Sequence, residues 1–350
     1  MNPDQVEVLI ECTRGSTVES THFGALAVVN SHGELLASNG DPQLTTFLRS
    51  SAKPFQALPF IELGGAEHFG LTDREIAILC ASHSGTDEHV ALLQGIHAKV
   101  GIGEEHLLCG THNPIHEPTA RALMLRGEKP TPIRHNCSGK HTGMLAHALL
   151  RNLSLEDYIN EQHPVQQIIL QAFADLVDVH PQDIPQGVDG CSAPVFAVPL
   201  YNAAYGMARL ADPIGFSPER TAALQRIFRS MAANGDMVAG PGRFDTLIMD
   251  WMAGKLVAKA GAEGYQVISL LPGTLGPGSP GIGIAYKIAD GDLSGRAGPL
   301  VGLAILRQLG LPTPGQAAEL AAFDRRPLYN WRKIPIGEIR PCFQLQKVKL

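Results

Sequence analysis

Segments of β-forming residues lie near both ends of the chain, and this placement constrains the fold more than any other feature. Residues 5–12 and 22–30 alternate or cluster β-forming residues and are joined through turns that contain glycine, and residues 33–38 predict a third strand. Residues 254–270 and 281–292 predict a returning pair of strands. An antiparallel sheet built from both chain ends, with a helical block inserted, best explains this order. The expected fold class is therefore α+β, a mixed α/β fold.

Helical patterns fill the middle of the chain. Thr72 and Glu75 have the spacing of a capping box, and Ser154 with Asp157 is expected to open a long amphipathic helix. Helices are predicted from about Ser50, from Thr72, over residues 86–100, 116–127, 154–178 and 296–310, in the apolar second half of 134–150, and twice between 217 and 253.

Length and composition indicate an ordinary soluble protein, with 350 residues of which 44% are hydrophobic and 18% charged. We expect one domain over residues 1–350 with two lobes, a sheet from about 1–48 and 254–350 and a mainly helical part from about 49–253. A net charge of −6 without basic runs argues against nucleic-acid binding. The chain has no apolar stretch long enough for a membrane span and no signal-peptide pattern, so we expect a cytoplasmic protein that acts on a small molecule.

A serine and a lysine stand three positions apart in the stretch "RSSAKPFQALP". Pro54 fits only the first turn of a helix, so Ser50 and Lys53 are expected near a helix N-terminus and on one face. A serine hydroxyl beside a lysine amine is a nucleophile beside its base. The alternative is an N-cap beside a surface charge.

Two further segments strengthen the catalytic interpretation. In "VAKAGAEG", Lys259 ends a predicted strand and is followed by a small residue and a glycine. This element is similar to the K-T-G element that accompanies S-x-x-K in penicillin-recognising enzymes, although Ala260 replaces the hydroxyl residue. In "ASHSG", Ser82 could relay a proton to a leaving group, as a second serine does in those enzymes. The alternative is a polar helix terminus.

A pair of cysteines suggests a metal. The six cysteines have no C-x-x-C spacing and are expected to be thiols in a reducing compartment. Cys137 and Lys140 stand three apart in "HNCSGKHTG", and Cys191 follows in "VDGCSAP". Thiolates favour zinc, but three or four ligands are normally needed. His135, His141 or water could complete the set.

Taken together, five segments resemble the rhizobial-type L-asparaginase family, also called the asparaginase II family: "LRSSAKPFQALP", "CASHSG", "HNCSGKHTGML", "VDGCSAPVFAVPL" and "KAGAEG". They occur in the right order over residues 48–264, and the flanking regions are compatible. The resemblance implies an L-asparagine amidohydrolase that is usually a homodimer, with a fold similar to serine β-lactamases and serine-dependent glutaminases.

The same resemblance implies a set of site residues. Two Ser-Lys pairs would act in tandem, Ser50 with Lys53 and Ser82 with Lys259. Zinc would be held by Cys137, Lys140 and Cys191, and the substrate would be bound by Arg49 and Asp189.

Amide hydrolysis gives each of these residues a chemical role. Ser50 would attack the carboxamide carbonyl while a neutral Lys53 accepts its proton, and Ser82 would pass a proton to the leaving nitrogen. Arg49 would bind the α-carboxylate of the substrate and Asp189 its α-ammonium group. Which pair supplies the nucleophile stays open at this point. A zinc amidohydrolase, a glutaminase and a non-catalytic amino-acid-binding protein remain as alternatives.

Overall fold

The computed structural model describes residues 2–311, 318–321 and 323–348. The chain divides into two compact units, of which the first combines the segments Met1–Leu48, Val198–Asp212 and Ala258–Leu350. The second combines Arg49–Ala197 and Pro213–Val257. The single domain with two lobes that we expect from the sequence stays a prediction. No helix within the described ranges is both long and apolar enough to cross a membrane.

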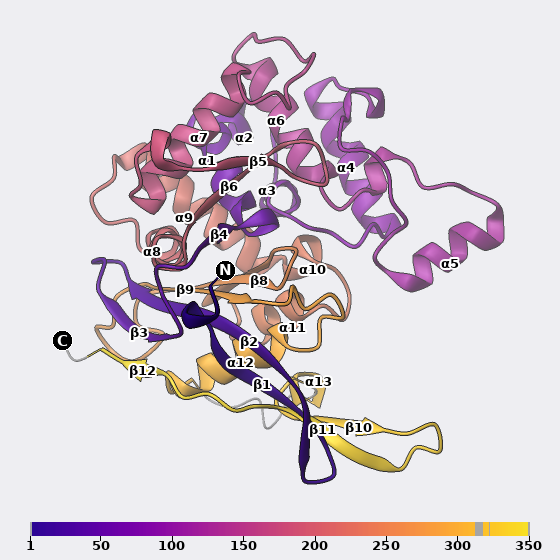
Figure 1. The fold of residues 1–350 in the computed structure, drawn as a ribbon. Coiled ribbons are helices and arrows are strands. Elements are labelled where there is room, and N and C mark those ends of the chain that lie inside the picture. The colour runs from indigo at the N-terminus through magenta and orange to yellow at the C-terminus, as the bar shows by residue number, and fades with distance from the viewer. Residues whose placement is uncertain (1, 312–317, 322, 349–350) are drawn as a thin grey trace. The chain divides into compact units, whose positions relative to one another are not determined.

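The first unit is built on an antiparallel sheet from both chain ends, as predicted (Figure 1). Its strand order is β10-β11-β1-β2-β9-β8-β7, and β3 pairs with both β2 and β12. Ile10 of β1 pairs with Pro341 of β11, and Gly24 of β2 pairs with Ile288 of β9. The strands are β1 (Glu7–Arg14), β2 (Thr17–Asn30), β3 (Leu35–Asn39), β7 (Leu256–Ala260), β8 (Tyr265–Leu270), β9 (Ile282–Ile288), β10 (Arg326–Tyr329), β11 (Pro335–Pro341) and β12 (Gln346–Lys347).

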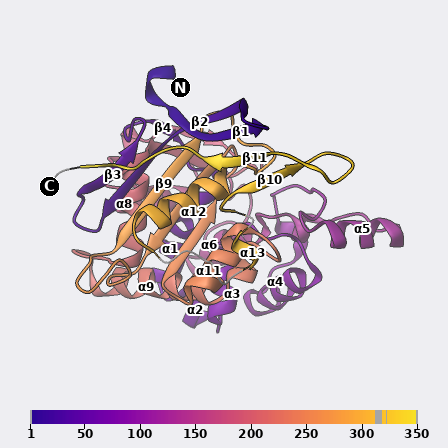
Figure 2. The same ribbon diagram turned by 90° about the horizontal axis from the view of Figure 1, so that it is seen from below.

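Two helices cover opposite faces of this sheet, α8 (Leu200–Ala211) and α12 (Gly298–Gln308), as Figure 2 shows. Helix α8 packs on β2, β8 and β9, and α12 packs on β1, β8 and β11. A Cβ atom on Gly283 of β9 would lie only 1.7 Å from the carbonyl oxygen of Ala204, so glycine is required where α8 meets the sheet.

The second unit is mainly helical, and α1 lies at its centre. Helix α1 contacts α6, α7 and α9, and all of its residues from Lys53 to Ile61 are buried. The helices are α1 (Lys53–Glu62), α2 (Gly65–His68), α3 (Asp73–Leu79), α4 (Asp87–Val100), α5 (Glu117–Arg126), α6 (Ser138–Leu150), α7 (Pro164–Val177), α9 (Pro218–Ala233), α10 (Gly235–Val238) and α11 (Phe244–Met252). A short antiparallel pair, β5 (Gln186–Val188) and β6 (Pro194–Pro199), follows α7.

Two helix starts differ from the sequence-based expectation. Helix α1 begins at Lys53, and Ser50 lies before it in a 3-10 turn over Arg49–Ala52. Helix α7 begins at Pro164, because His163 caps it with its own side chain and proline is favoured in a first helical turn. The capping box of Thr72 is confirmed.

Helix α6 approaches α3 so closely that one glycine has no substitute. A Cβ atom on Gly139 would lie 2.0 Å from the carbonyl oxygen of Ile78, whereas a Cβ atom on Gly143 would meet the Leu79 side chain at 3.6 Å, an ordinary contact. We expect Gly139→Ala to lower the free energy of unfolding by about 1 to 3 kcal/mol, because backbone must move. Gly143→Ala on the same helix should be neutral or stabilising. Urea unfolding of both variants checks this, and equal stabilities would contradict the close packing.

Candidate active site

Lys53 is a completely buried lysine whose amine is surrounded by three oxygen atoms. Its Nζ atom lies 2.7 Å from the carbonyl oxygen of Ala81, 2.8 Å from the hydroxyl of Ser82 and 3.2 Å from the carbonyl oxygen of Asn136. Lys53 reaches these partners from the first residue of α1. The segments that follow α3 and precede α6 supply the oxygen atoms.

The chemistry of these partners determines what a neutral amine could do here. An ammonium group has three N–H donors and can serve all three oxygens. A neutral amine has two N–H donors and one lone pair, and the two carbonyl oxygens can only accept. The hydroxyl of Ser82 is therefore the one partner that could donate its proton to the Lys53 lone pair.

Ser50 lies in the 3-10 turn just before Lys53, and its catalytic role stays a prediction. Its hydroxyl makes no hydrogen bond with any residue in the described part of the chain, and Lys53 contacts Ser82 instead. Lys259 is buried in β7, and its amine donates to the carbonyl oxygen of Ala260 at 2.6 Å. The pairing of Lys259 with Ser82 stays a prediction.

The loop that carries Ser82 is held by the last residue of α10 and the residue that follows it. The N–H of Ser82 donates to the carbonyl oxygen of Val238 at 2.9 Å, and the hydroxyl of Ser84 donates to that of Ala239 at 2.6 Å. Both bonds fix the backbone on either side of the Ser82 hydroxyl.

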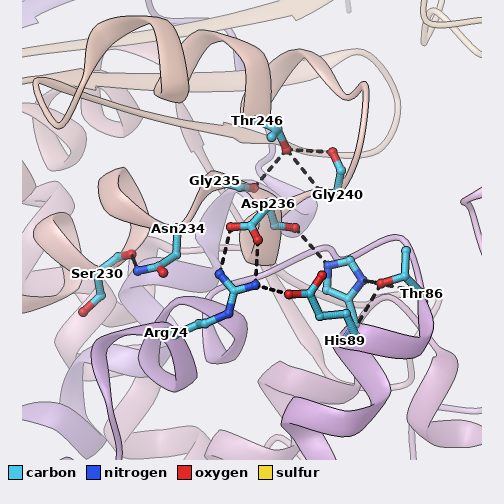
Figure 3. Close-up of polar contacts among 10 residues, drawn as sticks. Arg74, Thr86, His89, Ser230, Asn234, Gly235, Asp236, Gly240 and Thr246 are labelled. Atoms are coloured by element: carbon cyan, nitrogen blue, oxygen red, sulfur yellow. Dashed lines mark hydrogen bonds and ion pairs between the residues drawn. The ribbon is translucent and has the colours of Figure 1, made fainter.

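A polar network fixes that segment in turn (Figure 3). Arg74 of α3 forms two parallel bonds to the carboxylate of Asp236, at 3.2 and 2.7 Å, and also binds Glu88. His89 Nε2 donates to the backbone oxygen of Asp236 at 2.9 Å. The hydroxyl of Thr246 lies 2.9 Å from the carbonyl oxygen of Gly235, the first residue of α10. This network was not predicted from the sequence, because each of its members alone has the pattern of a surface or capping residue.

Several histidines of the second unit are buried, and burial disfavours their charged form. Burial lowers the pKa of His83 and of His89. On α6, burial and the charge of Arg151 lower the pKa of His147 to about 4, and Arg151 Nε donates to His147 Nε2 at 2.8 Å. The bond from Arg151 requires that His147 Nε2 carry no proton, which is consistent with an uncharged imidazole ring.

The pKa of His147 predicts a loss of stability in acid. An unfolded histidine takes up a proton below about pH 6.5, but the folded His147 does so only near pH 4. The contribution to stability is therefore complete above pH ~6.5 and declines as the pH falls towards 4, by up to roughly 1.4 kcal/mol per pH unit. Urea unfolding of His147→Gln between pH 7 and 4 should show a shallower pH dependence than the native chain. Identical slopes would contradict the assignment.

Arg49 and Asp189, both predicted to bind substrate, are brought together. Arg49 Nε donates to Asp189 Oδ1 at 2.8 Å, and the Asp189 side chain is only 9% exposed. Arg49 also has a left-handed backbone conformation with φ of 52°, which is costly for a residue other than glycine and is common at functional sites. Its two terminal guanidinium nitrogens make no hydrogen bond to a described residue. They could therefore bind a carboxylate through two bonds.

Of the three residues predicted to hold zinc, Lys140 and Cys191 are in contact and Cys137 is buried as well, while the metal site itself stays a prediction. Lys140 Nζ lies 3.0 Å from Cys191 Sγ, and all three residues are buried. A hydrogen bond from Cys137, followed by the charge of Lys140, lowers the pKa of the Cys191 thiol, while its bond to Cys191 and burial raise the pKa of Cys137. Burial alone would lower the pKa of Lys140, but the charges of Cys191, Cys137 and Asp189 together outweigh burial and raise that pKa.

The donor set of this cluster fits zinc in part. Two sulfurs and a nitrogen are ligands that zinc accepts, and a three-donor site leaves a position open. Histidine, cysteine and acidic residues alone form no group of three that could hold a metal in the described parts of the chain, so a zinc ion here would need Lys140 as a ligand. His135 accepts the N–H of Cys137 at 3.0 Å through Nδ1, which commits that nitrogen to the backbone.

Comparison with known protein families identifies one family that matches this chain. The model of the L-asparaginase II family matches residues 10–341. No curated protein is significantly similar to the chain in sequence.

Solved structures of glutaminases are distantly similar. A Bacillus glutaminase in 4.3 M NaCl is 14% identical with a TM-score of 0.38, over 82% of this chain and 91% of that chain. A probable glutaminase from Bacillus subtilis complexed with 6-diazo-5-oxo-L-norleucine is 14% identical with a TM-score of 0.36, over 82% and 84% of the two chains. These TM-scores are low, so the predicted likeness to serine β-lactamases and glutaminases stays a prediction.

Proposed function

Because this chain belongs to the L-asparaginase II family, it is an amidohydrolase, and we propose that it hydrolyses the side-chain amide of L-asparagine to aspartate and ammonia. The observation that carries the mechanism is the hydrogen bond between the buried Lys53 amine and the Ser82 hydroxyl. A lysine that exchanges protons with a serine supplies both the base and the acid that amide hydrolysis needs.

In the proposed mechanism, Ser50 Oγ attacks the carboxamide carbon and its proton passes to neutral Lys53. The N–H of Ser50 lies at the start of a helical turn, outside the regular hydrogen-bond pattern, and is a candidate donor to the oxyanion. Ser82 donates its proton to the departing nitrogen and regains one from Lys53, so ammonia leaves and a seryl ester remains. Water then hydrolyses the ester, releasing aspartate and restoring the serine.

A second assignment uses the same contact. The hydrogen bond between Ser82 and Lys53 also suits Ser82 as the attacking hydroxyl, since nucleophile and base then already lie within bonding distance. In that case Ser50 would not carry the acyl group. The role of Lys53 is the same in both assignments.

Substrate binding in this proposal uses both charges of the amino acid. The terminal nitrogens of Arg49 would bind the α-carboxylate while Nε holds Asp189, and the carboxylate of Asp189 would receive the α-ammonium group. Glutamine differs from asparagine by one methylene, which binding contacts discriminate by only ~1 to 3 kcal/mol. We therefore also expect measurable hydrolysis of glutamine.

Cys137, Lys140 and Cys191 would hold the zinc ion in this proposal. When bound, zinc would supply positive charge and could polarise an oxygen atom. Cys191 Sγ lies 4.0 Å from Asp189 Oδ2, so the cluster adjoins the residue proposed to bind the ammonium group. The homodimer and the cytoplasmic location remain predictions.

Ammonia release and covalent trapping test the proposal together. The purified chain should release ammonia from L-asparagine with a higher kcat/KM than from L-glutamine. A diazo-ketone analogue of asparagine should label one serine, and tandem mass spectrometry of the peptides that contain Ser50 and Ser82 identifies which. Binding of asparagine without ammonia release would instead favour the amino-acid-binding protein, and turnover with neither serine labelled would favour a metal-activated water.

A further inference from the structure

His112 is a half-buried histidine in the connection between α4 and α5, and the proposed mechanism does not use it. Its Nε2 atom lies 3.1 Å from the backbone N–H of Asn136, and its Nδ1 atom lies 2.6 Å from the carbonyl oxygen of Asn113. A carbonyl oxygen can only accept and a backbone N–H can only donate, so the ring proton sits on Nδ1 and Nε2 is the acceptor. His112 thus ties this connection to the segment that precedes α6.

A second imidazole holds the next N–H of the same segment. His135 Nδ1 accepts the N–H of Cys137 at 3.0 Å, and the ring centroids of His112 and His135 lie 4.3 Å apart. These two N–H groups belong to the two peptide planes that meet at Asn136, so together the bonds fix the direction of the Asn136 carbonyl group. His135 is part of the segment itself, whereas His112 holds it from a separate part of the chain.

The Asn136 carbonyl is one of the three oxygen partners of the Lys53 amine, at 3.2 Å. The carbonyl oxygens of Asn136 and Ala81 can only accept, so each takes one N–H of Lys53. The third position on the nitrogen carries the lone pair of the neutral amine or the third N–H of the ammonium group, and it then points to Ser82. If the Asn136 carbonyl turned away, a neutral Lys53 could donate to Ser82 instead, and its lone pair would no longer be aimed at that hydroxyl.

We propose that His112 is a positioning residue for catalysis, which holds the N–H of Asn136, aims the Asn136 carbonyl at Lys53 and thereby keeps the proton-exchanging position of the amine on Ser82. Both serine assignments use that exchange, so the inference rests on the proposed role of Lys53 but not on which serine attacks. Because His112 acts through the backbone of Asn136 and not on the substrate, its loss should lower kcat and spare asparagine binding.

Two substitutions with the same chemistry but different reach test the bond to Asn136. The amide oxygen of glutamine reaches about as far as Nε2 of histidine, whereas that of asparagine reaches only about as far as Nδ1. We expect His112→Asn to lower kcat for L-asparagine by about 10- to 100-fold with KM changed less than about threefold, because a slightly misplaced catalytic group costs this much. His112→Gln should keep kcat within about threefold of the native value, since it restores the acceptor.

A second removal variant and a binding measurement guard this comparison against misfolding. His112→Leu has no acceptor and should resemble His112→Asn, and calorimetric binding of asparagine shows that each variant is folded. Equal kcat values for His112→Asn and His112→Gln, or a loss that falls on KM alone, would overturn the proposal.

A double-mutant cycle with Lys53 separates positioning from a general structural role. In a Lys53→Met background, His112→Asn should lower the residual kcat by less than about twofold, because the amine that His112 positions is absent. A merely structural role would lower kcat by the same factor in both backgrounds, and that result would overturn the proposal. His116→Asn is the control, a half-buried histidine of the same connection whose Nδ1 lies 2.8 Å from Thr119 Oγ1. It should keep the native kcat, and a loss equal to that of His112→Asn would contradict a specific role of His112.

The outcomes also separate this inference from the proposed function. If the native chain releases no ammonia from asparagine, or if Lys53→Met keeps the native kcat, the proposed function fails and the positioning role fails with it. If Lys53→Met loses activity as expected but the His112 variants do not show this pattern, only the positioning role is overturned.

Discussion

Replacing Lys53 with methionine is expected to lower kcat for L-asparagine by about 100- to 10,000-fold, the usual loss when a general base is removed. Methionine keeps the apolar stem and fills similar space in the core of α1, but it cannot accept a proton from Ser82. It also leaves the carbonyl oxygens of Ala81 and Asn136 without this donor, so we expect a loss of stability as well. Steady-state kinetics combined with asparagine binding by calorimetry separates the two effects.

Lys99→Met is the matched control for this result. Lys99 also donates to a backbone oxygen, that of Gly70 at 3.0 Å, and to Glu75, but no proposed catalytic residue lies among its partners. Its removal should leave kcat within about twofold. A folded Lys53→Met variant that still hydrolyses L-asparagine at a tenth of the native rate would contradict the proposed proton transfer.

Arg49→Met should act mainly on substrate binding, raising KM by about 30- to 1,000-fold. This corresponds to the loss of about 2 to 4 kcal/mol from a charged group bound across a partly buried contact. The sharper measurement compares asparagine with 3-aminopropanamide, which is asparagine without its α-carboxylate. The native chain should strongly prefer asparagine, and Arg49→Met should largely lose that preference, because the group that recognises the carboxylate is gone.

Arg226→Met is the control for Arg49. Arg226 is similarly exposed and similarly paired, with Glu67 and with Asp73 at 3.3 Å, but it stands on α9 among surface carboxylates. Its substitution should leave KM and the preference for asparagine unchanged. If Arg49→Met keeps the full preference, another residue binds the carboxylate.

The sequence predicted those elements whose signals are local. The capping box at Thr72 was sufficient to predict α3, and the apolar spacing of residues 87–100 was sufficient to predict α4. The β-forming residues near the start of the sequence were likewise sufficient to predict β1, β2 and β3. Strands β10, β11 and β12 were missed, because β11 and β12 are stabilised by pairing with β1 and β3, far away in the sequence, and β10 pairs only with β11. The apolar spacing of α8 was present in the sequence but was overlooked.

In the candidate site, too, the sequence predicted residues marked by a local motif but not the contacts between distant segments. Family motifs identified Lys53 and Ser82, but the sequence did not indicate that the Lys53 amine bonds Ser82, because the two residues lie in separate segments. Nothing in the sequence indicates that Tyr158 forms a hydrogen bond with His141. Such contacts follow from packing, which a linear pattern does not encode.

The sheet of the first unit has a consequence for how the polypeptide is made. Strand β2 needs β9, and β1 needs β11, and the ribosome releases β9 and β11 long after β1 and β2. Closing so long a loop is slow, and unpaired strand edges invite aggregation meanwhile. The segments of the helical unit precede β9 and β11 and can fold first, so we expect nascent chains to depend on chaperones that shield the hairpin of β1 and β2 until β9 and β11 have been made.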